Sequence, residues 1–259
     1  MTDLLASLTA LSGQTEGWIW SAFLVFCRVG AVMALMPGFG EQMVPARVRL
    51  VLTLAFTAVV APSILPRIAP SGGDFFLPIA VEVAVGLSLG LGLRLFVMAL
   101  QMAGMIIAQA TSLAQLFGGM GAEPQPAIGN LLVMGGLALA VASGLHVRAA
   151  ELMILSYTIL PPGRLPNPSD MADWGLAEIA RAFSLAFMLA APFTIAALLY
   201  NVALGVINRA MPHLMVSFVG APALTLGGLI LLAIAAPLAL GLWLTEFNAF
   251  LANPFVAPP

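Results

Sequence analysis

The stretch GWIWSAFLVFCRVGAVMALMP, residues 17–37, is the first long apolar run of this chain. Arg28 is its only charged residue, and its length matches the roughly 20 apolar residues that a helix needs to cross a bilayer. A proline closes the run, as expected at the end of a helix. This stretch therefore predicts a membrane-spanning helix, and similar apolar runs follow along the chain.

The composition extends this prediction to the whole chain. Of its 259 residues, 61% are hydrophobic and 8% are charged, and the mean hydropathy is +1.07. Soluble domains carry roughly 25% charged residues. No polar stretch is long enough to fold separately, so residues 1–259 are predicted to form a single integral membrane domain that includes lipid among its contacts.

The expected fold is all-α, with about six long, partly kinked apolar helices arranged as helical hairpins. Pro45 is expected in the first turn of the second helix, and interruptions are expected near Pro222 and Pro237. The leucine spacing within residues 4–11 indicates a short amphipathic helix or an early start of the first helix. The expected ranges are 17–37, 45–66, 75–115, 126–160, 171–209 and 214–251.

Several functional classes are disfavoured by residue counts alone. All nine basic residues are arginines and the formal net charge is −2, so nucleic-acid binding has no electrostatic support. Cys27 is the single cysteine, which excludes an intrachain disulfide and a multi-cysteine metal site. We expect neither a metal nor a cofactor.

Three charges lie well inside apolar segments: Arg28, Glu82 and Arg94. Glu82 and Arg94 are separated by about 18 Å along a helix, so they cannot pair directly. Arg28 and Glu82 could form an interhelix pair. Because charges at membrane depth usually face protein, a partner or a cavity, the pair could neutralise itself structurally or serve as a proton or ion relay.

One pattern formally suggests an enzyme. GLSLG, residues 86–90, fits G-x-S-x-G, with Ser88 as nucleophile and His213 as an imaginable base of an intramembrane serine protease. The nucleophile elbow needs a strand–turn–helix context, whereas this serine lies in a long helical run. Gly86 and Gly90 are one turn apart, which instead predicts close packing of another helix. No catalytic site is expected.

The segment LAQLFGGMGAEPQP, residues 113–126, interrupts the apolar runs. Its glycines permit rearrangement, and Met98, Met102 and Met105 precede it on one helical face. Methionines give deformable apolar packing. The residues alone leave two interpretations open, a plain interhelical turn with core methionines or a deformable seal.

Three stretches together resemble one protein family. They are RVGAVMALMPGFGEQMVPARVRL at 28–50, GLHVRAAELMILSYTILPPG at 144–163 and LGVINRAMPHLMV at 204–216. In order and spacing they resemble the flagellar biosynthetic protein FliR family, R-type subunits of the type III export gate with injectisome relatives. The motif residues are Arg28, Gly30, Pro37, Pro45, Arg47, Arg49, Asn208, Arg209, Pro212 and Pro222.

The resemblance implies a non-enzymatic structural subunit of a protein-export channel in the bacterial inner membrane, at the flagellar basal body. It implies P-type and Q-type subunits and a B-type switch protein as partners, and unfolded flagellar subunits in transit. It also implies that residues 1–170 correspond to a P-type subunit and residues 171–259 to a Q-type subunit.

The resemblance further implies a pore plug in the loop between the third and fourth helices. The expected seal residues are Leu113, Leu116, Phe117, Gly118, Gly119, Met120 and Gly121, with Met98, Met102 and Met105 beside them. Many relatives carry an Asp-Pro turn in this loop, where this chain has glycines before Glu123. The alternative function is a small-solute or ion transporter that uses Arg28, Glu82 and Arg94 in a polar cavity.

Overall fold

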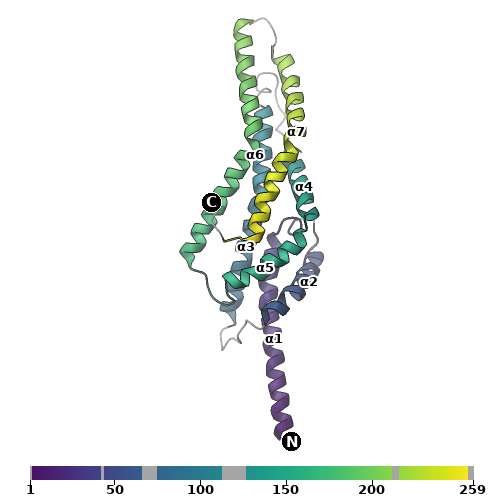
Figure 1. Cartoon of the computed structure of the whole chain (residues 1–259), viewed down its shortest axis with the longest axis vertical. Coiled ribbons are helices and arrows are strands. Elements are labelled where there is room, and N and C mark those ends of the chain that lie inside the picture. Colours follow the sequence, from purple (N-terminus) through teal and green to yellow (C-terminus); the bar gives the residue numbers. More distant parts are fainter. Residues whose placement is uncertain (1, 42–43, 66–74, 113–126, 212–215, 256–259) are drawn as a thin grey trace. The chain divides into compact units, whose positions relative to one another are not determined.

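The computed structural model describes residues 2–41, 44–65, 75–112, 127–211 and 216–255, and these ranges contain helices and connecting segments without strands (Figure 1). The all-α prediction is confirmed within them. The helices are α1 (Thr2–Leu35), α2 (Ala46–Ile64), α3 (Phe76–Ser112), α4 (Ala127–Ala142), α5 (Leu145–Ile159), α6 (Pro168–Ala210) and α7 (Val216–Ala252).

The structure settles one open alternative and contradicts two expectations about the helices. α1 starts at Thr2, so the leucine-spaced N-terminal residues form the start of the first helix. The expected fourth helix divides into α4 and α5 because Gly144 adopts a left-handed φ of 85°. α7 continues through Pro222 and Pro237; a proline removes one backbone hydrogen bond, which a long apolar helix with neighbours can tolerate.

The lengths and hydropathies of the helices fit a membrane protein. Five of the described helices are long and apolar enough to cross a bilayer, and α4 and α5 would make a sixth span if they are taken together. α3 and α6, with 37 and 43 residues, are longer than the roughly 20 residues that a span requires.

The chain forms two compact units. Unit 1 comprises Met1–Arg94, Gly144–Leu176 and Ala249–Pro259, and unit 2 comprises Leu95–Ser143 and Ala177–Asn248. The helices α3, α6 and α7 therefore each contribute residues to both units. The two units are described separately below.

Unit 1 is held together by a close approach of α1 to the first half of α3. A Cβ added at Gly86 would lie 2.7 Å from the Cβ of Ala31, and one added at Gly90 would lie 2.9 Å from the Cβ of Leu35. Real Cβ atoms do not approach so closely, which confirms the packing role predicted for these two glycines.

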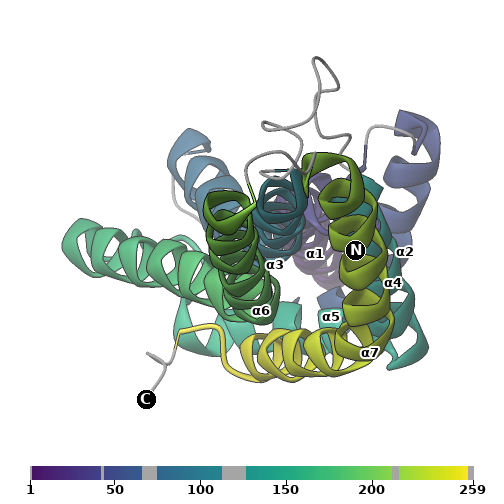
Figure 2. The same ribbon diagram turned by 90° about the horizontal axis from the view of Figure 1, so that it is seen from above.

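Unit 2 is built around an aromatic cluster from the second half of α3 and from α7. The Trp243 ring stacks on Phe247 at 4.9 Å, and Phe247 meets Phe96 edge-on at 5.6 Å. The Trp243 indole N–H donates to the Phe96 carbonyl at 2.9 Å. Figure 2 shows this part of α3 running beside α6, as it also does in Figure 1.

Candidate functional site

Arg28 of α1 and Glu82 of α3 form a buried ion pair in unit 1, so the predicted interhelix pairing is confirmed. Arg28 Nε lies 2.7 Å from Glu82 Oε2, and Arg28 Nη2 donates to Glu82 Oε1 at 3.2 Å. Both residues are fully buried. Two parallel hydrogen bonds of this kind fix the orientation of both groups as well as their separation.

The remaining guanidinium hydrogens bind groups at the end of α5. Nη1 donates to the Ser156 hydroxyl at 3.2 Å and to the Leu160 carbonyl at 3.1 Å, and Nη2 donates to the same carbonyl at 3.1 Å. An arginine side chain has five N–H groups. All five of those on Arg28 are therefore used.

Two further contacts complete this buried cluster. The Tyr157 ring lies against the guanidinium, with 3.8 Å from Arg28 Cζ to the ring centroid, a cation–π contact. The Gly163 N–H donates to Glu82 Oε1 at 3.2 Å. The two charged side chains are thus hydrogen-bonded to each other, to the Ser156 hydroxyl and to backbone groups. This arrangement favours structural neutralisation over an ion relay.

Arg94 is not part of this cluster. Its guanidinium lies 4.0 Å from Glu41, and the two side chains are 37% and 39% exposed. Arg28 and Glu82, by contrast, are fully buried and paired with each other. The three intramembrane charges do not share the polar cavity that the transporter alternative requires.

A second charged cluster lies in unit 2. Arg181 Nη2 donates to Glu246 at 2.8 Å, and Arg181 Nη1 lies 3.7 Å from Glu178. Glu178 and Arg181 are three positions apart, which places both on one face of α6. The contact with Glu246 of α7 was missed, because sequence spacing carries no signal for pairing between two distant helices.

The first family motif surrounds the turn between α1 and α2. A Cβ added at Gly30 would lie 3.4 Å from Thr53 Cγ2 of α2, so a small residue lets these helices meet.

Pro45 is the N-cap of α2, one residue before the expected first-turn position. Arg49 Nη2 donates to the Glu41 carbonyl at 3.0 Å, while Arg47 is exposed. Pro37 is buried at the turn.

The third family stretch, residues 204–216, falls partly at the end of α6. Asn208 and Arg209 lie exposed in its last turn, where a cation interacts favourably with the helix dipole. Pro212 lies outside the described residues, and Pro222 lies within α7.

The predicted seal lies within residues 113–126, which are outside the described residues. The methionines before it lie in α3, where Met98 is 46% and Met105 is 53% exposed and Met102 is half-buried. Met98 and Met105 are therefore not core methionines of this chain, as the plain-turn interpretation assumed. They form an outward apolar face on the part of α3 that leads into the segment.

The serine protease alternative gains no geometric support. The Ser88 hydroxyl donates to the Ala84 carbonyl at 2.9 Å within α3, and the flanking glycines contact α1. His213 lies outside the described residues. Within the described ranges, no three His, Cys, Asp or Glu side chains are grouped as metal ligands would be.

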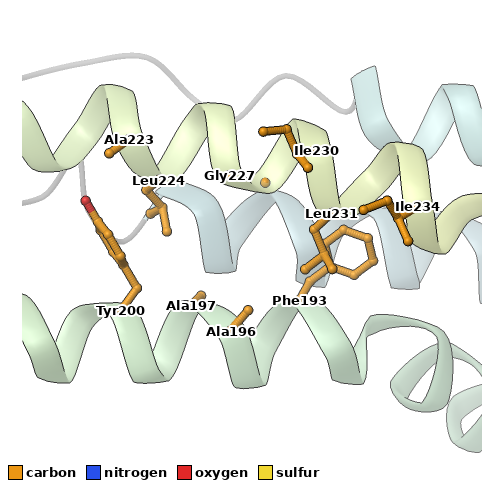
Figure 3. Close-up of a pocket in the computed structure, with 11 residues that line it drawn as sticks. Phe193, Ala196, Ala197, Tyr200, Ala223, Leu224, Gly227, Ile230, Leu231 and Ile234 are labelled. Atoms are coloured by element: carbon orange, nitrogen blue, oxygen red, sulfur yellow. The ribbon is translucent and has the colours of Figure 1, made fainter.

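Unit 2 also contains an apolar pocket of about 360 Å³ between α6 and α7 (Figure 3). Phe193 lies toward one end, and Tyr200 lies at the other, where its hydroxyl donates to the Gly220 carbonyl at 2.7 Å. No charged side chain lines the pocket. It offers hydrophobic contact and no group for acid–base chemistry.

Comparison with known proteins gives the same family as the sequence resemblance. The family described as bacterial export proteins, family 1, matches residues 19–250. The chain is 35% identical to the flagellar biosynthetic protein FliR of Caulobacter vibrioides over 90% of this chain and 95% of that protein. It is 29% identical to the FliR protein of Escherichia coli K12 (89% and 90% covered) and 29% identical to that of Aquifex aeolicus (86% and 88% covered).

Proposed function

The chain belongs to the FliR family of bacterial flagellar export proteins, and we propose that it forms and seals part of the export channel as a non-enzymatic structural subunit. It is a component of the flagellar type III export apparatus, located in the inner membrane at the flagellar basal body. The family match along nearly all of the apolar helices carries this proposal.

The proposed partners are P-type and Q-type gate subunits, a B-type switch protein and flagellar subunits in transit. The apolar surface of α6 and α7 supports helical neighbours: Phe187 is 62%, Ile234 is 65% and Leu238 is 76% exposed. Such a surface must be covered by lipid or by other apolar helices. In this assembly residues 1–170 take the place of a P-type subunit and residues 171–259 that of a Q-type subunit.

The proposed seal is formed by residues 113–122. A closed export channel must stop ions and yet yield to chains of varied sequence. The outward Met98 and Met105 support this role, because methionine side chains repack easily around different neighbours. Glycines 118, 119 and 121 supply the backbone freedom for opening.

Co-expression tests the assembly proposal. The chain is produced alone and with the P-type and Q-type subunits, and each sample is extracted in mild detergent and sized by chromatography. We expect a defined hetero-oligomer only on co-expression. A well-behaved monomer or small symmetric oligomer of the chain alone, unchanged by the other subunits, would support a transporter instead.

A further inference from the structure

The buried Arg28–Glu82 pair binds two backbone groups on either side of Pro161 and Pro162. We propose that the pair anchors the segment Leu160–Gly163 and thereby fixes the direction in which the chain leaves α5 toward α6. This goes beyond the export function, which does not by itself require a buried charge at this place. In this proposal Arg28 and Glu82 are positioning residues.

The end of α5 needs partners that its own continuation cannot supply. The last carbonyls of a helix have no intrahelical donor, and Pro161 and Pro162 have no N–H to offer them. The Leu160 N–H still reaches the Ser156 carbonyl at 2.8 Å. The Leu160 carbonyl is instead taken by two N–H groups of Arg28, a cation at the negative end of the helix.

Glu82 holds the other side of the same turn. Gly163 adopts a left-handed φ of +70°, and its N–H donates to Glu82 Oε1 at 3.2 Å. The Arg164 N–H donates to the Pro161 carbonyl at 3.4 Å and closes the turn. The pair therefore binds both ends of the turn, at the carbonyl of Leu160 and at the N–H of Gly163.

The donor count explains why arginine is required for this anchor. Arg28 makes two hydrogen bonds to Glu82, two to Leu160 and one to Ser156. A lysine has three donors on one nitrogen and lacks the fork that serves a carboxylate and a carbonyl together. A role limited to charge neutralisation would need only the positive charge.

Trypsin provides a local probe of the turn. Trypsin cuts after arginine and lysine, and the chain has nine arginines and no lysine. A single cut after Arg164 gives fragments 1–164 and 165–259. Arg164 is exposed, but cleavage requires the held turn to open. The test digests the full chain in the co-expressed, detergent-solubilised assembly. Arg164→Gln identifies the fragment by abolishing it.

Arg28→Lys keeps the charge and removes donors, so we expect cleavage after Arg164 at least about tenfold faster, with cuts after Arg181 and Arg209 unchanged. Arg94→Lys is the matched control, because within the described residues the ion pair of Arg94 is the half-exposed one with Glu41 at 4.0 Å; it should leave the cleavage rates after Arg164, Arg181 and Arg209 unchanged. A wild-type rate for Arg28→Lys, or equal acceleration at Arg181 and Arg209, would overturn the local anchor.

The exchanged pair Arg28→Glu with Glu82→Arg separates anchoring from neutralisation. It retains one positive and one negative charge, but places a carboxylate against the Leu160 carbonyl and a guanidinium against the Gly163 N–H. We expect cleavage after Arg164 to remain fast, with Arg181 still protected. Restoration of wild-type protection would show that only charge balance matters and would overturn the proposal.

Discussion

At the scale of single residues, polar groups in this apolar chain lie where backbone geometry needs them. Arg28 uses all five of its N–H groups, and Glu82 accepts from both Arg28 and the Gly163 backbone. Isolated buried charges would be costly in this surrounding. The cluster therefore makes the turn after α5 and the packing of α1 on α3 depend on the same two side chains.

Gly163→Ala should destabilise the fold by about 1–2 kcal/mol, because a left-handed backbone strains a residue with a Cβ. An added Cβ at Gly163 would meet nothing within 4 Å, so the cost is conformational rather than steric. The measurement is the thermal unfolding midpoint of the purified assembly.

Gly175→Ala is the matched control for this substitution. Gly175 lies within α6 and an added Cβ there also meets nothing within 4 Å, but the helical backbone favours alanine. We expect an unchanged or higher midpoint for Gly175→Ala. An equal midpoint for both variants would refute the strain argument.

At the scale of elements, helix positions depend on glycines that admit a neighbouring helix and on side-chain pairs that join helices. Gly86 and Gly90 bring α1 against α3 in unit 1. In unit 2, Arg181 joins α6 to Glu246 of α7. The glycine spacing was visible in the sequence, but the charged contact was not, because it joins residues 65 positions apart.

Gly86→Ala should destabilise unit 1 by about 1–3 kcal/mol through overpacking. The new Cβ would meet the Ala31 Cβ at 2.7 Å and the backbone of α1, which cannot move aside cheaply. The amount of chain recovered in the co-expressed assembly reports the effect. Gly241→Ala, where nothing lies within 4 Å, should be recovered at the wild-type level; equal loss for both would disprove the packing role.

Removing Arg181 should cost more than removing the Glu246 charge. Arg181→Gln leaves Glu178, only 3% exposed, without its cation, a loss on the order of 3 kcal/mol. Glu246 is 39% exposed, so Glu246→Gln should cost less than about 1 kcal/mol. Unfolding midpoints of the two variants, measured in parallel, test the order, and a reversed order would contradict the cluster described for unit 2.

At the scale of the whole molecule, composition predicted the membrane class and the long apolar runs predicted the all-α fold. The apolar runs also located most helix ends within a few residues. Gly144 shows the limit of prediction from sequence. Glycines are common inside membrane helices, so the sequence could not show that Gly144 adopts a left-handed φ of 85° and ends a helix rather than packing within one. The Arg28–Glu82 pair was predictable as a pair, but its hydrogen bonds to Leu160 and Gly163 were not, because a backbone carbonyl or N–H carries no residue signature.

The seal proposed for the export channel lies in the segment that follows the methionine face of α3. Met98 and Met105 point outward, so they need an apolar neighbour outside the core of this chain. A seal built from them and from residues 113–122 would close the channel while remaining deformable.

Deleting Gly118–Gly121 in the native cell tests this seal, with ion leakage across the inner membrane and flagellar subunit secretion recorded together. Deleting residues 71–74, four residues of another interhelical segment, is the length-matched control and should leave the barrier intact. We predict leakage with secretion retained for the Gly118–Gly121 deletion. An intact ion barrier with normal secretion would contradict the seal and reduce the segment to a connecting turn.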